Sequence, residues 1–362
     1  MRGGARGVVE HHARADLPCS MVQPFYPRSA GEQLGGGDAD WCPQACDATS
    51  PPRGRSYVII GGPPGHGTTA LYALLSTSHN VSNLCGLTGP LCEGGWIVAR
   101  GAPMHTGKAW THNWAASVNW TLRAFNAWRR VWNPRKCVHI EKSPIDLVWA
   151  PHQVDALMRT DAVPARAITV VLLTRSPCCP PTAVMNTSRY GWRRMHNIML
   201  RLGGPDEGLP NGIDMDAPIA THEEVRPRIV RAARHADRKP EARPPVAQAW
   251  LNMTAATVGM LRERRVRVVL VDYQTMIYDP FGAARTLSAL IPCIGQLHPG
   301  RTPERRLSTK GGRDESLLHY SRSRGAIIAA NRFVTINASV GPALRALGYT
   351  PAPPLFPPDP PS

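Results

Sequence analysis

The sequence YVIIGGPPGHGTTALYALLSTSHNVS, residues 57–82, contains a strand, a glycine-rich loop and a helix in immediate succession. The apolar, β-branched run at 57–60 predicts the strand, and the following segment ALYALLS predicts the helix. Between them stand Gly61, Gly62, Gly65 and Gly67, followed by Thr68 and Thr69. Backbone N–H groups at such a helix start converge on an anion, while glycines allow close approach and threonine hydroxyls add donors. The stretch therefore predicts a phosphate-binding loop.

Two common phosphate-binding patterns do not fit this loop. Gly62-x4-Gly67 has the spacing of a Walker loop, but Thr68 stands where that loop needs a lysine to reach the β- and γ-phosphates. A dinucleotide fingerprint fails as well, because its third glycine is missing and Ala70 follows the threonines. ATP or GTP hydrolysis is therefore disfavoured, and an unrelated phosphate-binding turn stays open as an alternative.

The composition allows one large α/β domain or two small ones, since 43% of the 362 residues are apolar. No apolar run approaches the roughly 20 residues that span a bilayer, and the N-terminus lacks a signal-peptide core. We expect membrane association only through an anchor that this sequence does not show. The net charge of +16 suggests an anionic partner, although a biased coding composition gives the same excess. No basic motif interleaved with aromatic residues favours nucleic acid.

Nine cysteines and five glycosylation sequons favour a secretory lumen over the cytosol. Cys42 and Cys46 are spaced for a local disulfide, as are Cys85 and Cys92. Cys42 and Cys46 are also placed to fix the end of the N-terminal segment to the domain. The sequon asparagines are Asn80, Asn119, Asn186, Asn252 and Asn337.

Strand and helix patterns alternate along the chain, which predicts an α/β fold with a parallel sheet. Further strands are predicted at 137–140, 167–174 and 266–271, and helices at about 110–132, 143–159, 246–264 and 279–290. The tryptophans of the first of these helices are expected in the core. The predicted divisions are a flexible N-terminal segment (1–55), one α/β domain (56–349) with an insertion or mobile loop (202–245), and a proline-rich tail (350–362).

Five segments in this order resemble motifs of the sulfotransferases that use 3′-phosphoadenosine 5′-phosphosulfate, particularly the Golgi carbohydrate branch. The window Gly65-His66-Gly67-Thr68-Thr69 is similar to that family's Lys-x-Gly-Thr-Thr loop. The other four segments are Glu141-Lys-Ser-Pro144, Val170 to Pro177, Val268 to Gln274 with Asp279-Pro280, and Lys310-Gly-Gly-Arg313. The resemblance covers about residues 56–349 and implies a P-loop-like, three-layer domain with a central parallel sheet between helices.

The resemblance also implies where the nucleotide co-substrate binds. It assigns the 5′-phosphosulfate to Gly65, His66, Gly67, Thr68 and Thr69, the 3′-phosphate to Arg175, and a closing basic loop to Lys310, Gly311, Gly312 and Arg313. Arg175 follows a central strand, at the edge where ligands of α/β proteins bind. The sequence departs from the family at two places: Gly65 stands where the family has its loop lysine, and Ala183 stands where it often has a second phosphate-binding serine. His66, Lys142 or Lys310 would then have to stabilise the leaving group.

An acceptor hydroxyl also needs a general base. Glu93 is the one acidic residue between Thr69 and Glu141, and it corresponds to the family's base, with His66 as the alternative. Neither role requires a metal. We expect sulfuryl transfer to a hydroxyl or amine of a carbohydrate or glycoprotein in the Golgi or secretory lumen. The alternatives are protein tyrosine sulfation, a cytoplasmic location, and a catalytically inactive relative that binds nucleotide or anionic glycan because Gly65 replaces the lysine.

Overall fold

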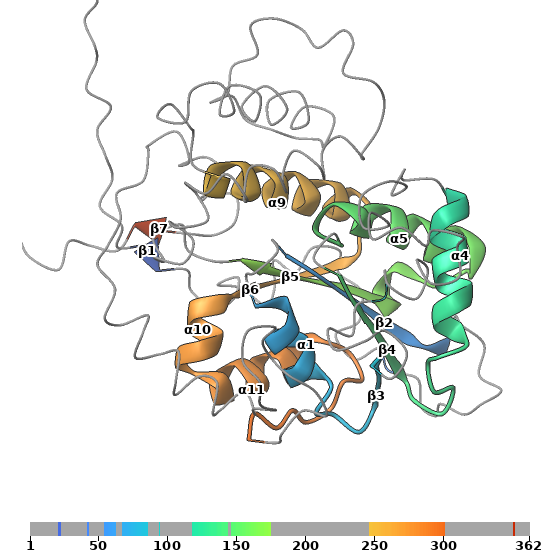
Figure 1. The fold of residues 1–362 in the computed structure, drawn as a ribbon, viewed down its shortest axis with the longest axis horizontal. Coiled ribbons are helices and arrows are strands. Elements are labelled where there is room, and N and C mark those ends of the chain that lie inside the picture. Colours follow the sequence, from blue (N-terminus) through green and yellow to red (C-terminus); the bar gives the residue numbers. More distant parts are fainter. Residues whose placement is uncertain are drawn as a thin grey trace, which may run out of the picture.

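A computed structural model of the chain describes residues 21–22, 42, 54–62, 67–85, 94, 118–143, 146–174, 246–300 and 350–351 (Figure 1). Its core is a five-stranded parallel sheet in the order β3-β4-β2-β5-β6. The strands are β2 (Ser56–Gly61), β3 (Val81–Ser82), β4 (Val138–Lys142), β5 (Ile168–Thr174) and β6 (Arg267–Asp272). The first strand of this sheet in the chain, β2, is therefore its central one.

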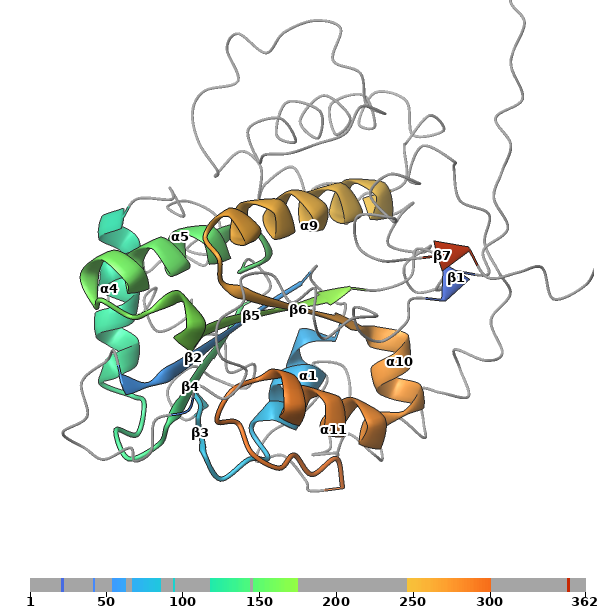
Figure 2. The ribbon, with the colours of Figure 1, turned by 180° about the vertical axis from the view of Figure 1, so that it is seen from behind.

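Helices cover both faces of the sheet, as Figures 1 and 2 show from opposite sides. One face carries α1 (Thr68–Leu75), α10 (Tyr273–Tyr278) and α11 (Pro280–Leu290). On the side of the other face lie α4 (Val118–Arg129), α5 (Asp146–Thr160) and α9 (Val246–Glu263). This arrangement confirms the predicted α/β class with a central parallel sheet between helical layers.

Burial along the strands follows from this layering. Every residue of β2 and β5 is buried, as expected for parallel strands that are covered on both faces. Alternate residues face opposite layers, so Val58 and Ile60 join the apolar cluster that includes Leu71 and Leu75 of α1. In α4 the predicted core position of the tryptophans is confirmed for Trp128, and Trp132 just beyond the helix is buried too. The predicted helix residues 110–117 lie outside the described part of the chain.

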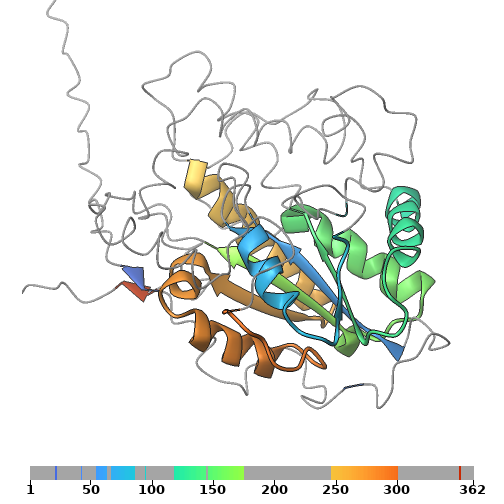
Figure 3. The ribbon, with the colours of Figure 1, turned by 60° about the horizontal axis from the view of Figure 1, so that its bottom comes forward.

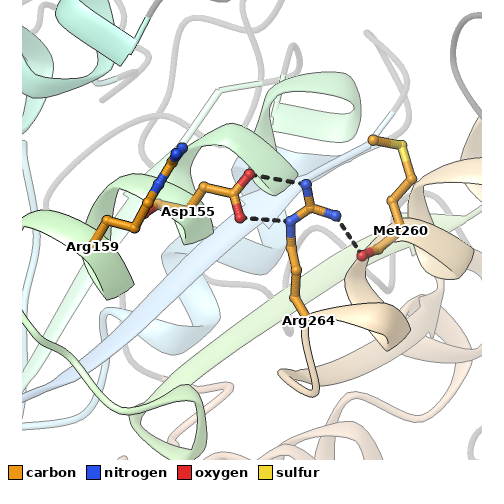
Figure 4. A network of polar contacts seen from close by, with 4 residues as sticks. All are labelled: Asp155, Arg159, Met260 and Arg264. Carbon is orange, nitrogen blue, oxygen red and sulfur yellow. Dashed lines mark hydrogen bonds and ion pairs between the residues drawn. The ribbon is translucent and has the colours of Figure 1, made fainter.

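An ion pair joins α5 to Arg264, the residue that follows α9 (Figure 4). Arg264 donates from Nε and Nη2 to the two carboxylate oxygens of Asp155 on α5, at 2.8 and 2.9 Å. Its Nη1 also donates to the carbonyl of Met260, at 2.7 Å. The planar guanidinium thus binds the carboxylate with two parallel bonds, a geometry that fixes orientation as well as distance.

Segments from near both ends of the chain pair with each other. The short strands β1 (Met21–Val22) and β7 (Thr350–Pro351) are antiparallel and stand beside the main sheet, drawn in blue and red in Figure 3. β1 belongs to the predicted N-terminal segment, and β7 begins the predicted proline-rich tail. No helix in the described ranges is long and apolar enough to cross a membrane.

The disulfides differ from the predicted local pairing. Cys42 is bonded to Cys293, which lies 251 positions away beyond α11, so the predicted Cys42–Cys46 bond is wrong. The expectation that Cys42 fixes the N-terminal segment to the domain is confirmed. Cys85 and Cys137 are disulfide-bonded as well, and Cys92 lies outside the described residues.

The sequon at Asn80 is half-buried and packs against the folded domain. Its Nδ2 donates to the carbonyl of Cys293 at 3.0 Å, beside the disulfide. The third sequon residue, Ser82, is buried in β3 and its hydroxyl accepts from the Asn133 amide at 2.7 Å. A glycan on the Asn80 nitrogen would have to fit beside the bond between Cys42 and Cys293, so the structure gives no support to this sequon as a glycosylation site.

Candidate functional site

The candidate site lies where the parallel strands end. The strand order places β3 and β4 on one side of β2 and β5 and β6 on the other. The chain connections therefore run in opposite directions from the centre of the sheet, which makes the centre a topological switch point. In open α/β sheets, ligands bind beside the carboxyl ends of the strands at such a point. The glycine loop after β2 begins at this edge.

Gly67 forms the start of helix α1. Its φ of 99° is in the left-handed region, and no side chain caps the helix. The carbonyl of Gly67 accepts from the amides of Ala70 and Leu71, at 2.9 and 3.1 Å. The amides of Thr68 and Thr69 precede this first helical bond, and amides at that position have no partner within a helix. They belong to the positive end of the helix dipole, which favours an anion.

Close packing explains why glycines occur in this loop. A Cβ on Gly67 would lie 2.5 Å from Cε2 of Tyr273, the first residue after β6. A Cβ on Gly62 would lie 2.8 Å from the Leu173 carbonyl oxygen of β5. Either atom would overlap its neighbour, so the loop and the ends of β5 and β6 can pack this closely only without side chains at these two positions.

Lys142 reaches the same place from the neighbouring strand. It is the last residue of β4, pairs with Ile60 in register, and is fully buried. Its ammonium donates to the hydroxyl of Thr69, with Nζ 3.2 Å from Oγ1. A buried cation therefore points at the first turn of α1.

This contact has an electrostatic consequence. The N-terminus of a helix carries a partial positive charge, so a cation is normally unfavourable there. Burial adds a further desolvation cost for the Lys142 charge. An anion held between Lys142 and the first turn of α1 would relieve both costs. The arrangement is therefore suited to binding a phosphate or sulfate group.

Glu141 faces the opposite side of the sheet from Lys142, because successive strand residues alternate. Its Oε1 accepts from the Ser143 hydroxyl at 2.8 Å. Asp146 also accepts from the Ser143 amide and from Nε2 of Gln153, at 2.8 and 2.9 Å. Burial first, and then the nearby Glu141 carboxyl, raise the pKa of Asp146 well above its usual value. We call the carboxyls of Glu141 and Asp146 the acid pair.

Gly94 packs directly on Glu141. A Cβ on Gly94 would lie 2.6 Å from Oε1 of Glu141 and 2.8 Å from Cε2 of Trp128. The Trp128 indole also donates to the Gly94 carbonyl at 2.9 Å. Gly94 is thus held at the end of β4 by contacts from two elements. Glu93, its neighbour in the sequence, lies outside the described residues.

The structure brings together four of the predicted site residues. Gly67, Thr68 and Thr69 form the start of α1, and Lys142 contacts Thr69. The other predicted positions lie outside the described residues: Gly65, His66, Glu93, Arg175, Lys310, Gly311, Gly312 and Arg313. The strand before Arg175 ends at Thr174, at the same edge of the sheet as the glycine loop.

Sequence reasoning missed the roles of three residues. Tyr273 packs on Gly67, and Glu141 and Asp146 form the acid pair. Tyr273 falls in helix α10, so the strand in the segment from Val268 to Gln274 ends earlier, at Asp272. The sequence signal for the acid pair was the spacing of Glu141, Ser143 and Asp146 across the turn after β4.

The chain was compared with known proteins. No protein-family model and no curated protein matches it. Among solved structures, the sulfotransferase domain of the olefin synthase from Synechococcus PCC 7002 is similar to it, with 10% sequence identity and a TM-score of 0.36. The match covers 83% of this chain and 97% of that domain. A similarity of this size does not establish a family, so function has to be argued from the site itself.

Proposed function

We propose that this chain is a sulfotransferase that moves a sulfuryl group from 3′-phosphoadenosine 5′-phosphosulfate to a hydroxyl or amine of a carbohydrate. The observation that carries the proposal is the bond from buried Lys142 to Thr69 in the first turn of α1. The sequence lacks a lysine at Gly65, and Lys142 supplies a cation to the same loop from the adjacent strand.

The donors around the loop suit the 5′ end of such a nucleotide. The first-turn amides of α1 and the hydroxyls of Thr68 and Thr69 can donate to phosphate and sulfate oxygens. Lys142 adds a charge-assisted donor. Gly67 leaves room for the Tyr273 ring beside this helix start. These groups stabilise negative charge mainly by being held in position before the reaction.

When bound, the nucleotide supplies an activated sulfuryl group. The acceptor oxygen forms a new bond to sulfur, and the bond from sulfur to the 5′-phosphate oxygen breaks with its electron pair left on the phosphate. The acceptor proton passes to a base. Lys142 and the α1 amides then stabilise the negative charge that develops on the leaving phosphate, as in phosphoryl transfer.

The remaining roles rest on the sequence resemblance. Glu93 is proposed as the base, and its position next to Gly94 supports this because Gly94 packs against the end of β4. His66 is the alternative base. Arg175 is proposed to bind the 3′-phosphate, and the loop of Lys310, Gly311, Gly312 and Arg313 to close over the nucleotide.

The proposed acceptor is a carbohydrate or glycoprotein in the Golgi or secretory lumen. The disulfide between Cys42 and Cys293 supports an oxidising compartment, where such bonds persist. A protein that binds nucleotide or anionic glycan without turnover is the second candidate, and Gly65 is the residue that favours it.

Labelled-sulfate transfer across a panel of glycan acceptors tests the proposal. We expect transfer by the wild type, and loss of transfer in Glu93→Gln with nucleotide binding retained. Glu263→Gln is the matched control, because Glu263 is exposed at the end of α9. Nucleotide binding without transfer to any acceptor in the wild type would favour the second candidate, and a gain of transfer in Gly65→Lys would show that the loop is impaired.

A further inference from the structure

The strands of the main sheet begin at the edge opposite the candidate site, and a basic residue stands one or two positions before each of them. In the spatial order of the strands, these residues are His79, Lys136, Arg55, Arg166 and Arg265. The strand starts are nearly level. Val138 of β4 pairs with the first residues of β3 and β2, β5 starts one residue later than β2, and β6 one residue later than β5. The five positions therefore form a row across this edge of the sheet.

This edge of the sheet carries a positive charge at its surface. Five basic side chains near the strand starts reach solvent fully or in part, and we call them the basic edge: Arg135, Lys136, Arg166, Arg262 and Arg265. Two further arginines nearby are paired with carboxylates, Arg264 with Asp155 and Arg129 with Asp161. Among the described residues near the strand starts, Glu263 is the one exposed acid.

Neither a uniform excess of arginine nor the helix dipoles explain the basic edge. The opposite end of the sheet differs, since β6 ends at the acid Asp272 and β4 ends with one acid and one base. A helix dipole favours a cation in the last turn of a helix, which accounts for Arg262 in α9. It does not account for Arg135, Lys136 and Arg166, which stand several positions beyond the ends of α4 and α5.

Hydrogen bonds fix the turn that carries two of these cations. The Arg135 amide donates to Oδ1 of Asn133 at 2.9 Å, and the Lys136 amide donates to the Asn133 carbonyl at 3.1 Å. The Lys136 ammonium donates to the carbonyl of His79, which joins this turn to the one before β3. Because the backbone is already ordered, little of its conformational entropy would be lost when a ligand binds.

Arg265 stands in a conformation that usually selects glycine. It follows α9, its amide donates to the Arg262 carbonyl at 2.9 Å, and its φ of 55° is in the left-handed region. Glycine is the usual residue at such a helix end, because any side chain there is strained. The Arg265 side chain is exposed, so packing does not explain why the chain keeps an arginine at this position. The strain favours a role for this side chain at the surface.

The shape of the basic edge suits a polymer with repeated negative charges. Adjacent strands lie about 4.8 Å apart, so the row before five strands extends over about 19 Å. A single phosphate group would meet only one or two of these cations. We propose that the basic edge binds a linear anionic polysaccharide, with sulfate or carboxylate groups of the polymer against Arg135, Arg166 and Arg265. This binding site is separate from the candidate site and requires no sulfuryl transfer.

The disulfides favour a polysaccharide over the other common polyanions. Cys137, which directly follows Lys136, is disulfide-bonded, as is Cys42 with Cys293. Such bonds persist in oxidising compartments, away from nucleic acids and from the anionic lipids of the cytoplasmic leaflet. Single-stranded nucleic acid would also need aromatic side chains on which its bases stack. The described aromatic side chains near the strand starts, Tyr57 and Trp132, are buried.

The experiment titrates the purified protein with a heparin octasaccharide by calorimetry at about 0.15 M salt. We expect wild-type binding that weakens steeply as the salt concentration rises, because the polymer releases counterions. Arg135→Gln, Arg166→Gln and Arg265→Gly should each lower the affinity by about fivefold, and the three together by about 100-fold. Arg285→Gln is the matched control. It removes the same charge from an exposed position in α11, and the affinity should stay within about twofold of the wild type.

Arg265→Gly separates lost binding from lost stability. Glycine adopts the left-handed conformation without strain, so this variant should melt at the wild-type temperature or above it while it binds the octasaccharide more weakly. A variant with the wild-type affinity would show that the Arg265 side chain does not contact the polymer, and would overturn the proposed site.

Two other polyanions test the class of partner. Single-stranded DNA of the same net charge and vesicles containing phosphatidylserine should each bind at least about tenfold more weakly than the octasaccharide. Equal or tighter binding of either one would overturn the assignment to a polysaccharide. Absence of octasaccharide binding in the wild type, or an unchanged affinity in the triple variant, would overturn the basic edge as a binding site.

A competition experiment separates this inference from the proposed function. Saturating 3′-phosphoadenosine 5′-phosphate should not displace the octasaccharide, because the two sites lie at opposite edges of the sheet. Displacement would place the polysaccharide in the candidate site and overturn the inference. If the protein binds no nucleotide, the sulfotransferase assignment fails, whereas the arginine variants still decide whether the basic edge binds the polymer.

Discussion

The ammonium of Lys142, at the end of β4, donates a hydrogen bond to Thr69 in the first turn of α1, with 3.2 Å between Nζ and Oγ1. Two residues 73 positions apart in the chain thus place a positive charge beside the first turn of α1. The register of β4 against β2, in which Lys142 pairs with Ile60, produces this contact.

Replacing Lys142 by methionine should weaken nucleotide binding without lowering the stability of the fold. We expect the fold to be retained or stabilised, because a buried charge is removed without a large change in volume. Binding of 3′-phosphoadenosine 5′-phosphate should weaken by about 10- to 100-fold, the effect of losing a hydrogen bond to a charged group. Calorimetric titration and thermal melting measure the two effects. Lys136→Met is the control because Lys136 is only half-buried and lies near the other end of β4, and equal nucleotide affinity in the two variants would refute a role for Lys142 in binding.

Replacing Gly67 by alanine should destabilise the domain. An alanine at a φ of 99° is strained, and its Cβ would overlap the ring of Tyr273. Together these effects should lower the free energy of unfolding by about 2–4 kcal/mol, measured by urea denaturation. Gly300→Ala is the matched control, because nothing lies within 4 Å of a Cβ there. A loss in Gly67→Ala no larger than in the control would mean that the loop packs differently.

Much of the fold could be predicted because its signals are local. The apolar runs at 57–60 and 167–174 are buried parallel strands, and Asp279 caps α11 by accepting from the Gly282 amide at 2.8 Å. The turn after β4 was predicted less well. The strand continues through Lys142, α5 begins at Asp146, and Ser143 bonds to Glu141 instead of capping the helix.

The contacts that define the site could not be predicted, because they depend on which strands become neighbours. Nothing in the sequence near Lys142 specifies that β4 lies beside β2, or in which register. The same applies to Tyr273 and Gly67, which meet only because β6 ends at the same edge as the loop. The disulfide is the clearest case: the short spacing of Cys42 and Cys46 suggested a local bond, but the fold brings Cys42 to Cys293.

The domain should lose stability in acid through His139. Burial first, and then the nearby Arg55, lower the pKa of His139 from 6.5 to about 3. The unfolded chain therefore binds a proton between these values that the folded chain does not, and stability falls as the pH drops from about 6.5 toward 3. His139→Phe preserves a ring against Trp132 and should flatten the dependence in this range. Thermal melting from pH 7 to pH 4 measures it, and an unchanged slope in the variant would assign the acid sensitivity to other groups.

Removing the disulfide by replacing Cys42 and Cys293 together with serine should cost about 2–5 kcal/mol of unfolding free energy. The bond closes a long loop and lies beside the contact between Asn80 and the Cys293 carbonyl. Substitution is preferable to a reductant, because Cys85 and Cys137 are disulfide-bonded as well. Denaturation curves give the loss, and peptide mapping without reduction identifies the bond. A wild type in which Cys42 is found linked to Cys46 would contradict the structure.

The sulfotransferase assignment is tested most directly by comparing two nucleotides as stabilising ligands of the purified wild-type protein. At a concentration about 100 times its dissociation constant, a ligand adds about 2.7 kcal/mol to the stability of the folded state. We predict that 3′-phosphoadenosine 5′-phosphate raises the melting temperature clearly more than ATP at the same concentration. Equal stabilisation by the two nucleotides, or none by either, would contradict the account.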